Sequence, residues 1–386
     1  ITVGGTNGKG STVAALEALL LAAGETVGCY TSPHLLAYNE RVRLNGHDVS
    51  DESLIRAFEQ VEEARGNTSL TYFEFGTLAA FLVMAEAGVD NLVLEVGLGG
   101  RLDAVNVLDA DLAIITSVDL DHTAWLGNDR NTIGYEKAGI LRPGQTAIYG
   151  DDDPPPSILQ QASAQNVRLL RPGHGYDIRS LGTRAQLLTG DGHGIDLPGN
   201  SLPLNSLAAA AMACLALGVG LDDTAMARVL AGVTLPGRFE QVARSPDVFL
   251  DVGHNPHAAG WLARRLETLR DAGGYQRLLA VYAGLEDKDS AGVARILAPQ
   301  VDHWFLAGLD VPRGLSGEAL AARLGTEIPT GGATLHGHVA EAIAGEMQSA
   351  GQGDLVLVFG SFFTVVEGKR YFSAGSYGSV MDRRTL

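Results

Sequence analysis

A glycine-rich run near the start of the chain has the residue types that hold a phosphate. It reads Gly4-Gly5-Thr6-Asn7-Gly8-Lys9-Gly10-Ser11-Thr12 and lies between a strand expected at residues 1–3 and a helix expected at residues 11–23. Glycines allow backbone N–H groups to turn inward around a phosphate, while the helix N-terminus and the lysine add positive potential. The phosphate-binding residues predicted here are Thr6, Asn7, Gly8, Lys9, Gly10 and Ser11. The alternative is a glycine-rich turn with an exposed lysine.

The spacing of this run differs from the strict P-loop pattern, because Gly10 follows the lysine where a hydroxyl normally binds magnesium. A second motif, Thr31-Ser32-Pro33-His34, follows a strand expected at residues 27–30. Loops at the carboxyl ends of parallel strands form the ligand crevice of such a sheet, so Ser32 could supply the missing hydroxyl. Taken alone, a Ser-Pro pair is an ordinary turn.

A carboxylate, Glu95, stands inside the apolar strand expected at residues 91–96, just before the loop Gly97-Leu98-Gly99-Gly100. A buried carboxylate must be paired or bind a cation. A hard oxygen ligand beside nucleotide phosphates is the usual magnesium arrangement, so Glu95 is a candidate metal ligand. A salt bridge to a neighbouring arginine is the structural alternative.

A histidine and a lysine complete the first group of candidates. His122 follows the strand expected at residues 112–117, within Asp119-Leu120-Asp121-His122-Thr123. A lone histidine is more often structural than a ligand, but a parallel sheet brings consecutive strand ends together, and four candidate groups at four strand ends favour one site. Lys137 lies on a short helix that ends at Gly139, and by composition alone it is a surface lysine.

Two more motifs lie downstream, Leu235-Pro236-Gly237-Arg238-Phe239-Glu240 and Asp251-Val252-Gly253-His254-Asn255-Pro256-His257. Arg238 is always charged and suits a phosphate. Asp251 follows a strand and could bind a ribose hydroxyl, as an acidic residue does at other nucleotide sites. In isolation, each motif is equally consistent with a surface salt bridge or a helix cap.

The elements that must position these residues alternate between apolar strands and helices, which predicts an α/β fold with a parallel sheet. Further helices are expected at residues 51–64 after the cap Ser50, at 74–87 before Gly88, and at 204–217 and 222–231. Residues 150–200 differ and predict small antiparallel strands. A new alternation begins near Val248, with strands expected at residues 278–282, 304–306 and 355–359. We place the domain boundary near Ser245-Pro246, which gives domains of residues 1–245 and 246–386.

Composition narrows the function further. The chain has 386 residues, 28 of them basic and 45 acidic, for a formal net charge of −17, which disfavours non-specific binding to nucleic acid or an anionic membrane. Apolar residues at 46% and charged residues at 19% describe a globular protein. Cys29 and Cys214 show no spacing pattern, which excludes a disulfide scaffold and suits the cytoplasm. Apolar runs stay shorter than the roughly 20 residues of a membrane helix. Because the chain opens on Ile1 within a strand, we expect a segment to precede it.

Taken together, the motifs resemble the folylpolyglutamate synthase/dihydrofolate synthase family, within the Mur-ligase-like amide ligases. The resemblance runs through nearly the whole chain. Its motifs are Gly5-Thr6-Asn7-Gly8-Lys9-Gly10-Ser11, Thr31-Ser32-Pro33-His34, Glu95-Val96-Gly97-Leu98-Gly99-Gly100, Leu120-Asp121-His122, Glu136-Lys137-Ala138-Gly139-Ile140, Leu235-Pro236-Gly237-Arg238-Phe239, His254-Asn255-Pro256, Asp287-Lys288-Asp289 and Phe359-Gly360-Ser361. The ordered set is specific, although Gly-Thr-Asn-Gly-Lys alone is shared with all Mur-like ligases.

The resemblance implies a P-loop ATPase domain with a mainly parallel sheet, followed by a smaller Rossmann-like domain, with the active site between them. It also implies a reaction. ATP phosphorylates a pterin-linked carboxylate to an acyl phosphate, and the amine of L-glutamate then displaces the phosphate. The substrates would be dihydropteroate, tetrahydrofolate and L-glutamate, and the chain would act in the cytoplasm as a monomer that binds neither nucleic acid nor a membrane.

The resemblance further implies roles for individual residues. Lys9 and its glycines would hold the ATP phosphates, Ser32 and Glu95 one Mg²⁺, and His122 a second Mg²⁺. Lys137 matches a lysine that becomes carbamylated, which turns a cation into an anionic oxygen ligand. Asn205, Arg238 and Asp251 match ATP contacts, while His254 and Ser361 match positions near the glutamate site. The catalytic set is then Lys9, His122, Lys137 and His254, and the pterin-binding set is Thr71, Tyr72, Phe73, Glu74, Leu102, Asp103 and Ala104.

Three alternatives to the bifunctional enzyme stay open. Some members of the family only extend folates with glutamate, and the segment Leu70-Thr71-Tyr72-Phe73-Glu74-Phe75 resembles the pterin loop of the bifunctional kind. A cell-wall Mur ligase shares the phosphate loop but should lack the Ser-Pro-His motif and the pterin-like loop. A nucleotide-binding module without ligase activity is disfavoured, because Lys9, Glu95, His122 and Lys137 are all present.

Overall fold

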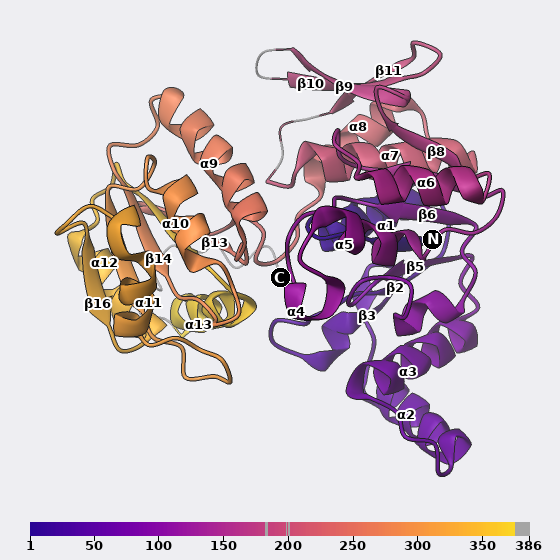
Figure 1. Cartoon of the computed structure of the whole chain (residues 1–386), viewed down its shortest axis with the longest axis horizontal. Helices are drawn as coiled ribbons and strands as arrows, with labels where there is room; N and C mark the ends of the chain where they lie inside the picture. Colours follow the sequence, from indigo (N-terminus) through magenta and orange to yellow (C-terminus); the bar gives the residue numbers. More distant parts are fainter. Residues whose placement is uncertain (182–183, 198, 200, 375–386) are drawn as a thin grey trace. The chain divides into compact units, whose positions relative to one another are not determined.

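The computed structural model describes residues 1–181, 184–197, 199 and 201–374, and the chain divides into two compact units, Ile1–Leu235 and Pro236–Leu386 (Figure 1). Both units are α/β, as predicted. The division falls earlier than the boundary expected near Ser245-Pro246. The physical reason is strand β12 (Glu240–Ala243), which pairs with β13 (Asp247–Asp251) in the sheet of the second unit.

The first unit contains the expected alternation of strands and helices. Its strands are β1 (Thr2–Gly4), β2 (Val27–Tyr30), β3 (Val42–Leu44), β4 (His47–Asp48), β5 (Asn91–Glu95), β6 (Leu112–Ile115), β7 (Thr146–Tyr149), β8 (Arg168–Pro172), β9 (Gly175–Leu181), β10 (Arg184–Thr189) and β11 (Gly194–Leu197). Its helices are α1 (Lys9–Ala22), α2 (Asp51–Arg65), α3 (Tyr72–Ala87), α4 (Thr123–Leu126), α5 (Arg130–Ala138), α6 (Pro156–Ala164), α7 (Leu204–Leu217) and α8 (Asp223–Gly232), with short 3-10 turns η1 (Tyr38–Arg41) and η2 (Ala104–Val107).

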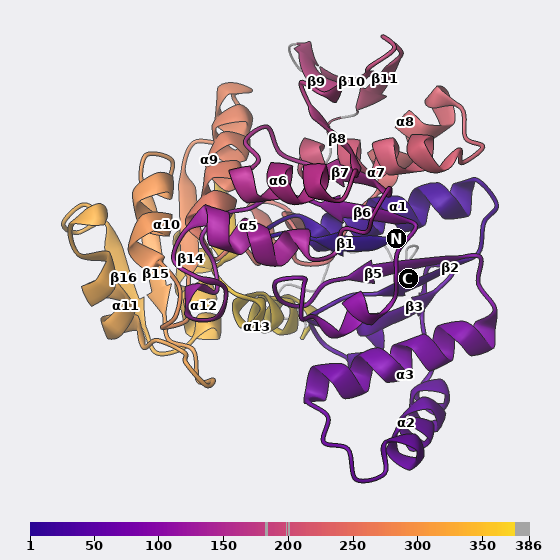
Figure 2. The ribbon, with the colours of Figure 1, turned by 45° about the vertical axis from the view of Figure 1, so that its right-hand side comes forward.

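These strands form one sheet in the order β11-β10-β9-β8-β7-β6-β1-β5-β2-β3-β4. The central strands from β8 to β2 run parallel, and β9, β10 and β11 form the antiparallel extension predicted within residues 150–200. Side chains alternate between the two faces of the sheet. Ile114 packs with α1, α7 and α8, whereas its neighbours Ala113 and Ile115 pack with α2, α3, α5 and α6. Figure 2 shows α1, α7 and α8 on one side of the sheet and α2 and α3 on the other.

The order of the central strands decides where the functional loops meet. Strand β1 lies between β5 and β6, and β2 lies beside β5, all in parallel register. The loops that follow these four strands therefore leave the sheet at the same edge, where ligands of open α/β sheets bind. Each of the first four predicted motifs lies in one of these loops or at its start.

The second unit has its own sheet, in the order β12-β13-β17-β14-β15-β16. Its remaining elements are β14 (Leu278–Tyr282), β15 (His303–Ala307), β16 (Ala333–His336), β17 (Leu355–Phe359), α9 (Pro256–Asp271), α10 (Ser290–Leu297), α11 (Gly317–Leu324), η3 (Gly325–Glu327), α12 (Val339–Ser349) and α13 (Phe362–Ser373). Helices α9, α10 and α11 share one core with Trp304 and Phe359, while α12 and α13 pack against neighbouring strands of the sheet. Strand β16, which the sequence analysis missed, is short and half exposed.

Two sequence-based exclusions can be compared with the structure. Cys29 and Cys214 are both free and buried, in agreement with the absence of a disulfide scaffold. Within the described ranges, none of the helices combines the length and the apolar character that a membrane crossing requires.

One buried acid in the second unit has no evident role in packing. Glu346 on α12 is 0% exposed, and neither carboxylate oxygen has a hydrogen-bond partner among the described residues. Burial raises the pKa of Glu346 well above its ordinary value, and the charge of Asp354 adds to this effect. The folded chain therefore favours the neutral acid. Its contribution to stability is complete below the pKa of an unfolded carboxyl group and is lost as the pH rises toward the folded pKa.

We predict that Glu346→Gln stabilises the second unit at pH 8 and has much less effect at pH 5, because glutamine cannot ionise. Each kcal/mol regained shifts the melting temperature by about 2–4 °C in a chain of this size. Calorimetry at both pH values measures the difference, with Glu267→Gln at an exposed position of α9 as the control. An equal change in melting temperature at pH 5 and pH 8 would contradict a neutral Glu346.

Candidate active site

The glycine-rich run connects β1 to α1, and two of its glycines are required by the space around them. A Cβ at Gly5, where φ is +143°, would lie 1.9 Å from Thr116 Oγ1. A Cβ at Gly8, where φ is +87°, would lie 2.8 Å from Ser206 Oγ. Gly8 also starts α1, which begins at Lys9, two positions earlier than expected. The backbone of the loop is thus packed against two other elements before any ligand binds.

Residues at the end of β6 hold this loop in place. Thr6 N donates to Ser117 O at 2.8 Å, and Thr116 Oγ1 donates to Asn7 O at 2.6 Å. Asn7 N also donates to Ser117 Oγ at 3.2 Å. Sequence reasoning missed Thr116 and Ser117, although two adjacent hydroxyl residues at the end of an apolar strand are a signal that could have identified them.

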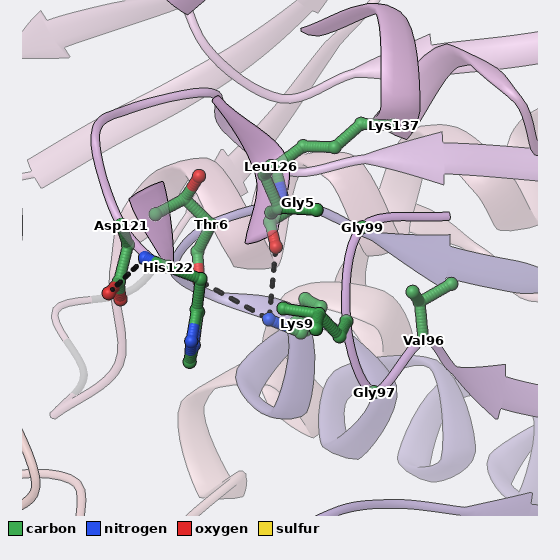
Figure 3. Close-up of a pocket in the computed structure, with 11 residues that line it drawn as sticks. Gly5, Thr6, Lys9, Val96, Gly97, Gly99, Asp121, His122, Leu126 and Lys137 are labelled. Carbon is green, nitrogen blue, oxygen red and sulfur yellow. Dashed lines mark hydrogen bonds between the residues drawn. The ribbon is translucent and has the colours of Figure 1, made fainter. Parts of the chain in front are cut away.

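Lys9 folds back over its own loop, where its Nζ donates to Gly5 O at 3.0 Å and to Thr6 O at 3.2 Å (Figure 3). It lines a small cavity together with three other predicted residues, Thr6, His122 and Lys137. The full lining is Gly5, Thr6, Lys9, Val96, Gly97, Leu98, Gly99, Asp121, His122, Leu126 and Lys137. The cavity thus gathers the ends of β1, β5 and β6 and the helix α5, as the sheet topology requires.

Lys137 is buried, and its surface-lysine interpretation is wrong. Its side chain is 3% exposed near the end of α5. Burial, with the nearby charge of Lys9 as the second cause, lowers the pKa of Lys137 from 10.5 to about 7, while Asp121 acts in the opposite direction. A substantial fraction of this amine is therefore neutral and nucleophilic near pH 7. No carboxylate forms an ion pair with it in the part of the chain that the structure describes.

Ser32 and Glu95 lie together, as predicted for two ligands of one cation. Glu95 is 6% exposed at the end of β5, and its Oε2 accepts from Ser32 N at 3.2 Å. The same oxygen lies 3.8 Å from the position that a Cβ on Gly10 would take, so the pair adjoins the first turn of α1.

His122 starts α4 with a positive φ of 52° and lies beside Asp121 in the cavity lining. Among the described residues, His, Cys, Asp and Glu side chains do not gather in groups of three that could hold a metal ion.

Helix α3 begins at Tyr72, two positions before the start expected at residue 74, so Tyr72 and Phe73 lie in the helix and not in a loop before it. Thr71 caps the helix, with its Oγ1 accepting from Glu74 N at 3.2 Å and Glu74 Oε2 accepting from Thr71 N at 2.7 Å. In the sequence, the pattern Thr-x-x-Glu before an apolar run predicts such a capping box. The two aromatic residues differ. Tyr72 is 64% exposed, whereas Phe73 packs against Gly97, where a Cβ would lie 2.6 Å from its ring.

The neighbouring predicted residues Leu102, Asp103 and Ala104 also have distinct positions. Leu102 is 80% exposed, and Ala104 begins η2. Asp103 organises the glycine loop, since its carboxylate accepts from Leu98 N at 2.9 Å and from Val105 N at 3.0 Å. Burial raises the pKa of Asp103, and these backbone bonds and the charge of Lys9 oppose that shift.

The remaining predicted nucleotide contacts lie at the start of α7 and in the second unit. Asn205 is exposed in the first turn of α7, next to Ser206, whose Oγ donates to Gly8 O at 3.4 Å. Arg238 holds its guanidinium 5.1 Å from the centre of the Phe362 ring. Asp251 is 4% exposed, and its carboxylate accepts from Phe239 N at 2.8 Å and Gly253 N at 2.7 Å. Its evident role is to shape the backbone beside Arg238.

The two predicted glutamate-site residues are also in the second unit. His254 Nδ1 lies 2.9 Å from Val252 O, which orients its ring. Ser361 is buried and caps α13, where its Oγ accepts from Thr364 N at 3.0 Å.

Comparison with known proteins decides the family. The Mur ligase middle domain matches residues 3–213, and the Mur ligase, glutamate ligase domain, matches residues 237–362. The Escherichia coli protein named dihydrofolate synthase/folylpolyglutamate synthase is 44% identical over 366 residues, covering 94% of this chain and 84% of the relative. This chain belongs to the dihydrofolate synthase/folylpolyglutamate synthase family of Mur ligases.

Solved structures agree with this assignment. E. coli FolC in complex with DHPP and ADP superposes with a TM-score of 0.91 at 42% identity, covering 97% of this chain and 88% of that one. The bifunctional folylpolyglutamate synthase/dihydrofolate synthase of Yersinia pestis, complexed with AMPPNP and a Mn ion, gives a TM-score of 0.89 at 44% identity, covering 96% and 88%. The family expected from the sequence motifs is thus confirmed.

Within this ligase family, the first unit brings together two groups of predicted residues. Lys9, His122 and Lys137 share the cavity, and Ser32 with Glu95 adjoins the same first turn of α1. Phe73 and Asp103 both contact the glycine loop that lines this cavity. Leu102 projects into solvent instead, whereas Tyr72 is largely exposed but has its ring beside Tyr38 and the Arg41 guanidinium.

We predict that Thr116→Ala raises the KM for ATP by about two- to tenfold, because the variant loses the hydroxyl that fixes the Asn7 carbonyl. That range corresponds to one neutral hydrogen bond of about 0.5–1.5 kcal/mol. Thr116→Ser keeps the hydroxyl and should behave as wild type. Steady-state kinetics with ATP as the varied substrate makes the comparison, and equal KM values for the two variants would contradict the role of the hydroxyl.

Proposed function

We propose that this chain is an ATP-dependent, ADP-forming ligase that adds L-glutamate to dihydropteroate and to reduced folates. The observation that carries the proposal is a phosphate loop with Lys9 at the same sheet edge as Glu95, His122 and a buried Lys137. The names of its relatives, and the ADP and AMPPNP bound in two related structures, support the same activity.

The residues suit the chemistry of making an amide from a carboxylate. A carboxylate is a poor electrophile, so its oxygen first attacks the γ-phosphate of ATP and forms an acyl phosphate. The amine of L-glutamate then displaces the phosphate. Lys9 and the N-terminus of α1 stabilise the charge that develops on the transferred phosphoryl group. This scheme needs no side chain as a nucleophile.

A divalent cation fits the buried carboxylate of Glu95, because a carboxylate at a strand end beside a phosphate loop is otherwise a costly arrangement. We propose Ser32 and Glu95 as ligands of one Mg²⁺ and His122 as a ligand of a second. When bound, such ions polarise phosphoryl oxygens and neutralise developing charge. The Mn ion in the related Y. pestis structure supports a divalent metal in the family.

We also propose that Lys137 carries a carbamate. Its neutral amine attacks CO₂, a C–N bond forms, and one proton is released, which leaves an anionic carbamate in place of a cation. The lowered pKa of Lys137 supports this step, because it supplies neutral amine near pH 7. A carbamate also replaces the repulsion between Lys137 and Lys9 with attraction. It adds an oxygen ligand for a metal, which matters because the described His, Cys, Asp and Glu side chains form no group of three that could hold one.

The other substrate contacts follow from the family motifs. We propose Asn205, Arg238 and Asp251 for ATP, and His254 and Ser361 for L-glutamate. For the pterin end of the acceptor we propose Thr71, Tyr72, Phe73, Glu74, Leu102, Asp103 and Ala104. Phe73 is the member best placed for ring stacking, because it already rests on the glycine loop at Gly97. We expect a monomer that acts in the cytoplasm, where its two free cysteines stay reduced.

The decisive test measures ADP release from the chain with dihydropteroate, tetrahydrofolate or a muramyl peptide as the acceptor. Stimulation by the first two supports the bifunctional ligase. Stimulation by tetrahydrofolate alone indicates a folylpolyglutamate synthase, and stimulation by the muramyl peptide alone indicates another Mur ligase.

We predict that Lys9→Ala releases no ADP with any acceptor while melting near the wild-type temperature, since the charge of Lys9 serves ATP and not the core. Normal turnover in this variant would contradict the phosphate-loop assignment.

For Lys137 we predict that ¹³C-bicarbonate gives a carbamate signal in NMR spectra of the wild type that Lys137→Arg lacks. Arginine keeps the positive charge but cannot be carbamylated, so this variant should also lose activity by at least about a hundredfold, or about 2.7 kcal/mol of barrier. Lys369→Arg is the matched control, because Lys369 is absent from the cavity lining and pairs with Glu240. Full activity in Lys137→Arg would refute the carbamate.

A further inference from the structure

Arg41 is a buried arginine that the mechanism above does not use. It ends η1 and is 8% exposed. Throughout the described residues, its guanidinium has no carboxylate within ion-pair distance. A nearly buried charge without a counter-ion is costly, and such charges are retained where a ligand supplies the opposite charge.

Neutral groups hold the guanidinium on several sides. Arg41 Nε donates to His34 Nδ1 at 2.8 Å. The guanidinium carbon lies 5.4 Å from the ring centre of Tyr38 and 5.5 Å from that of Tyr72, and the Tyr30 hydroxyl is a further hydrogen-bonding neighbour. Aromatic faces stabilise a cation in part, but they do not neutralise it. The planar fork is therefore oriented and still carries its full charge.

The same contact defines the state of His34, which is the last residue of the Thr-Ser-Pro-His motif. Because His34 Nδ1 accepts a hydrogen bond from Arg41, that nitrogen carries no proton. The neutral ring then carries its proton on Nε2. The hydrogen bond from Arg41 thus makes Nε2 of His34 a donor, in addition to the guanidinium donors. The two side chains together offer only donors to an incoming group.

Arg41 lies between the two parts of the site that an acceptor must span. Its carbonyl accepts from Thr31 N at 2.9 Å, which places it beside Ser32, the partner of Glu95. On its other side, Tyr72 precedes Phe73 at the start of α3. An acceptor with its ring at Phe73 and its reacting end near Glu95 would pass this position.

We propose that Arg41 and His34 form a carboxylate-binding subsite for the acceptor, a proposal that rests on the proposed function. A guanidinium binds a carboxylate in a bidentate, charge-assisted geometry that neutral donors cannot match. Two carboxylates are chemically possible. The reacting carboxylate is present in dihydropteroate and in folates, whereas the α-carboxylate of an existing glutamyl residue is present in folates only.

Steady-state kinetics on Arg41→Gln with both acceptors separates these sources. We expect the KM of the acceptor to rise by about 10- to 100-fold, the range for a charge-assisted hydrogen bond. The KM values for ATP and L-glutamate should stay within about twofold. A loss with both acceptors assigns the reacting carboxylate, and a loss with tetrahydrofolate alone assigns the glutamyl α-carboxylate. Arg56→Gln is the control, since Arg56 is an exposed arginine of α2 paired with Glu86.

A charge-specific readout distinguishes binding from a merely structural role. Dihydropteroate and its carboxamide are compared as ligands of the wild type and of Arg41→Gln by equilibrium binding. Where the subsite holds the reacting carboxylate, the wild type should prefer the acid by at least tenfold, and Arg41→Gln should lose most of that preference. If Arg41→Gln does not fold, Arg41→Lys, which keeps the charge but not the planar fork, is measured in the same way and should lose part of the preference.

An unchanged acid-to-amide ratio in a folded variant, together with an unchanged KM for tetrahydrofolate, overturns the subsite, as does a rise in the KM for ATP without a change for either acceptor. These outcomes are distinct from failure of the proposed function, in which the wild type itself would release no ADP with either acceptor.

Discussion

The active-site edge depends on one close approach, between the backbone of Gly5 and the side chain of Thr116. A Cβ at Gly5 would lie 1.9 Å from Thr116 Oγ1, so the loop can rest on the end of β6 only because position 5 has no side chain. This contact sets the position of Asn7, whose carbonyl accepts from Thr116, and of Gly8, where α1 begins. The N-terminus of α1 and Lys9 are then aimed at one point. The phosphate loop is thus pre-organised by the sheet, and binding need not order it.

The second constraint is the burial of positively charged side chains, above all Lys137. Lys137 and Lys9 line one small cavity, and the loss of water together with their mutual repulsion lowers the pKa of Lys137 to about 7. With a pKa of about 7, a substantial fraction of this lysine is neutral near pH 7, whereas a solvated lysine would stay protonated. The buried environment therefore explains the lowered pKa of Lys137, a residue that composition alone assigned to the surface.

The sequence predicted the site residues that belong to short local motifs, but it did not predict roles that depend on contacts between distant segments. The run from Gly4 to Thr12, the strand that holds Glu95 and the turn at His122 each show a pattern within a few residues, and the topology of the parallel sheet brings them together. The start of α3 was misplaced because the capping box of Thr71 and Glu74 was not recognised. Thr116 acts through the Asn7 carbonyl and Asp251 through the Phe239 N–H, both on other segments. Arg41 owes its interest to the absence of a carboxylate partner among the described residues. None of these relations leaves a mark at fixed spacing in the sequence.

The net charge of −17 makes the local placement of cations decisive. ATP, the carboxylate of an acceptor and L-glutamate are all anionic, so the overall field of the chain opposes their binding. That field is screened beyond about 8 Å at physiological salt, whereas groups in a buried site are screened much less. Lys9, at the start of α1, and Arg41, beside two tyrosine rings, are cations that the fold of the first unit holds in place. An acidic surface repels most anions, whereas a few oriented, poorly hydrated cations attract an anion that contacts several of them at once. This difference is a physical basis for selecting a pterin-linked carboxylate beside ATP.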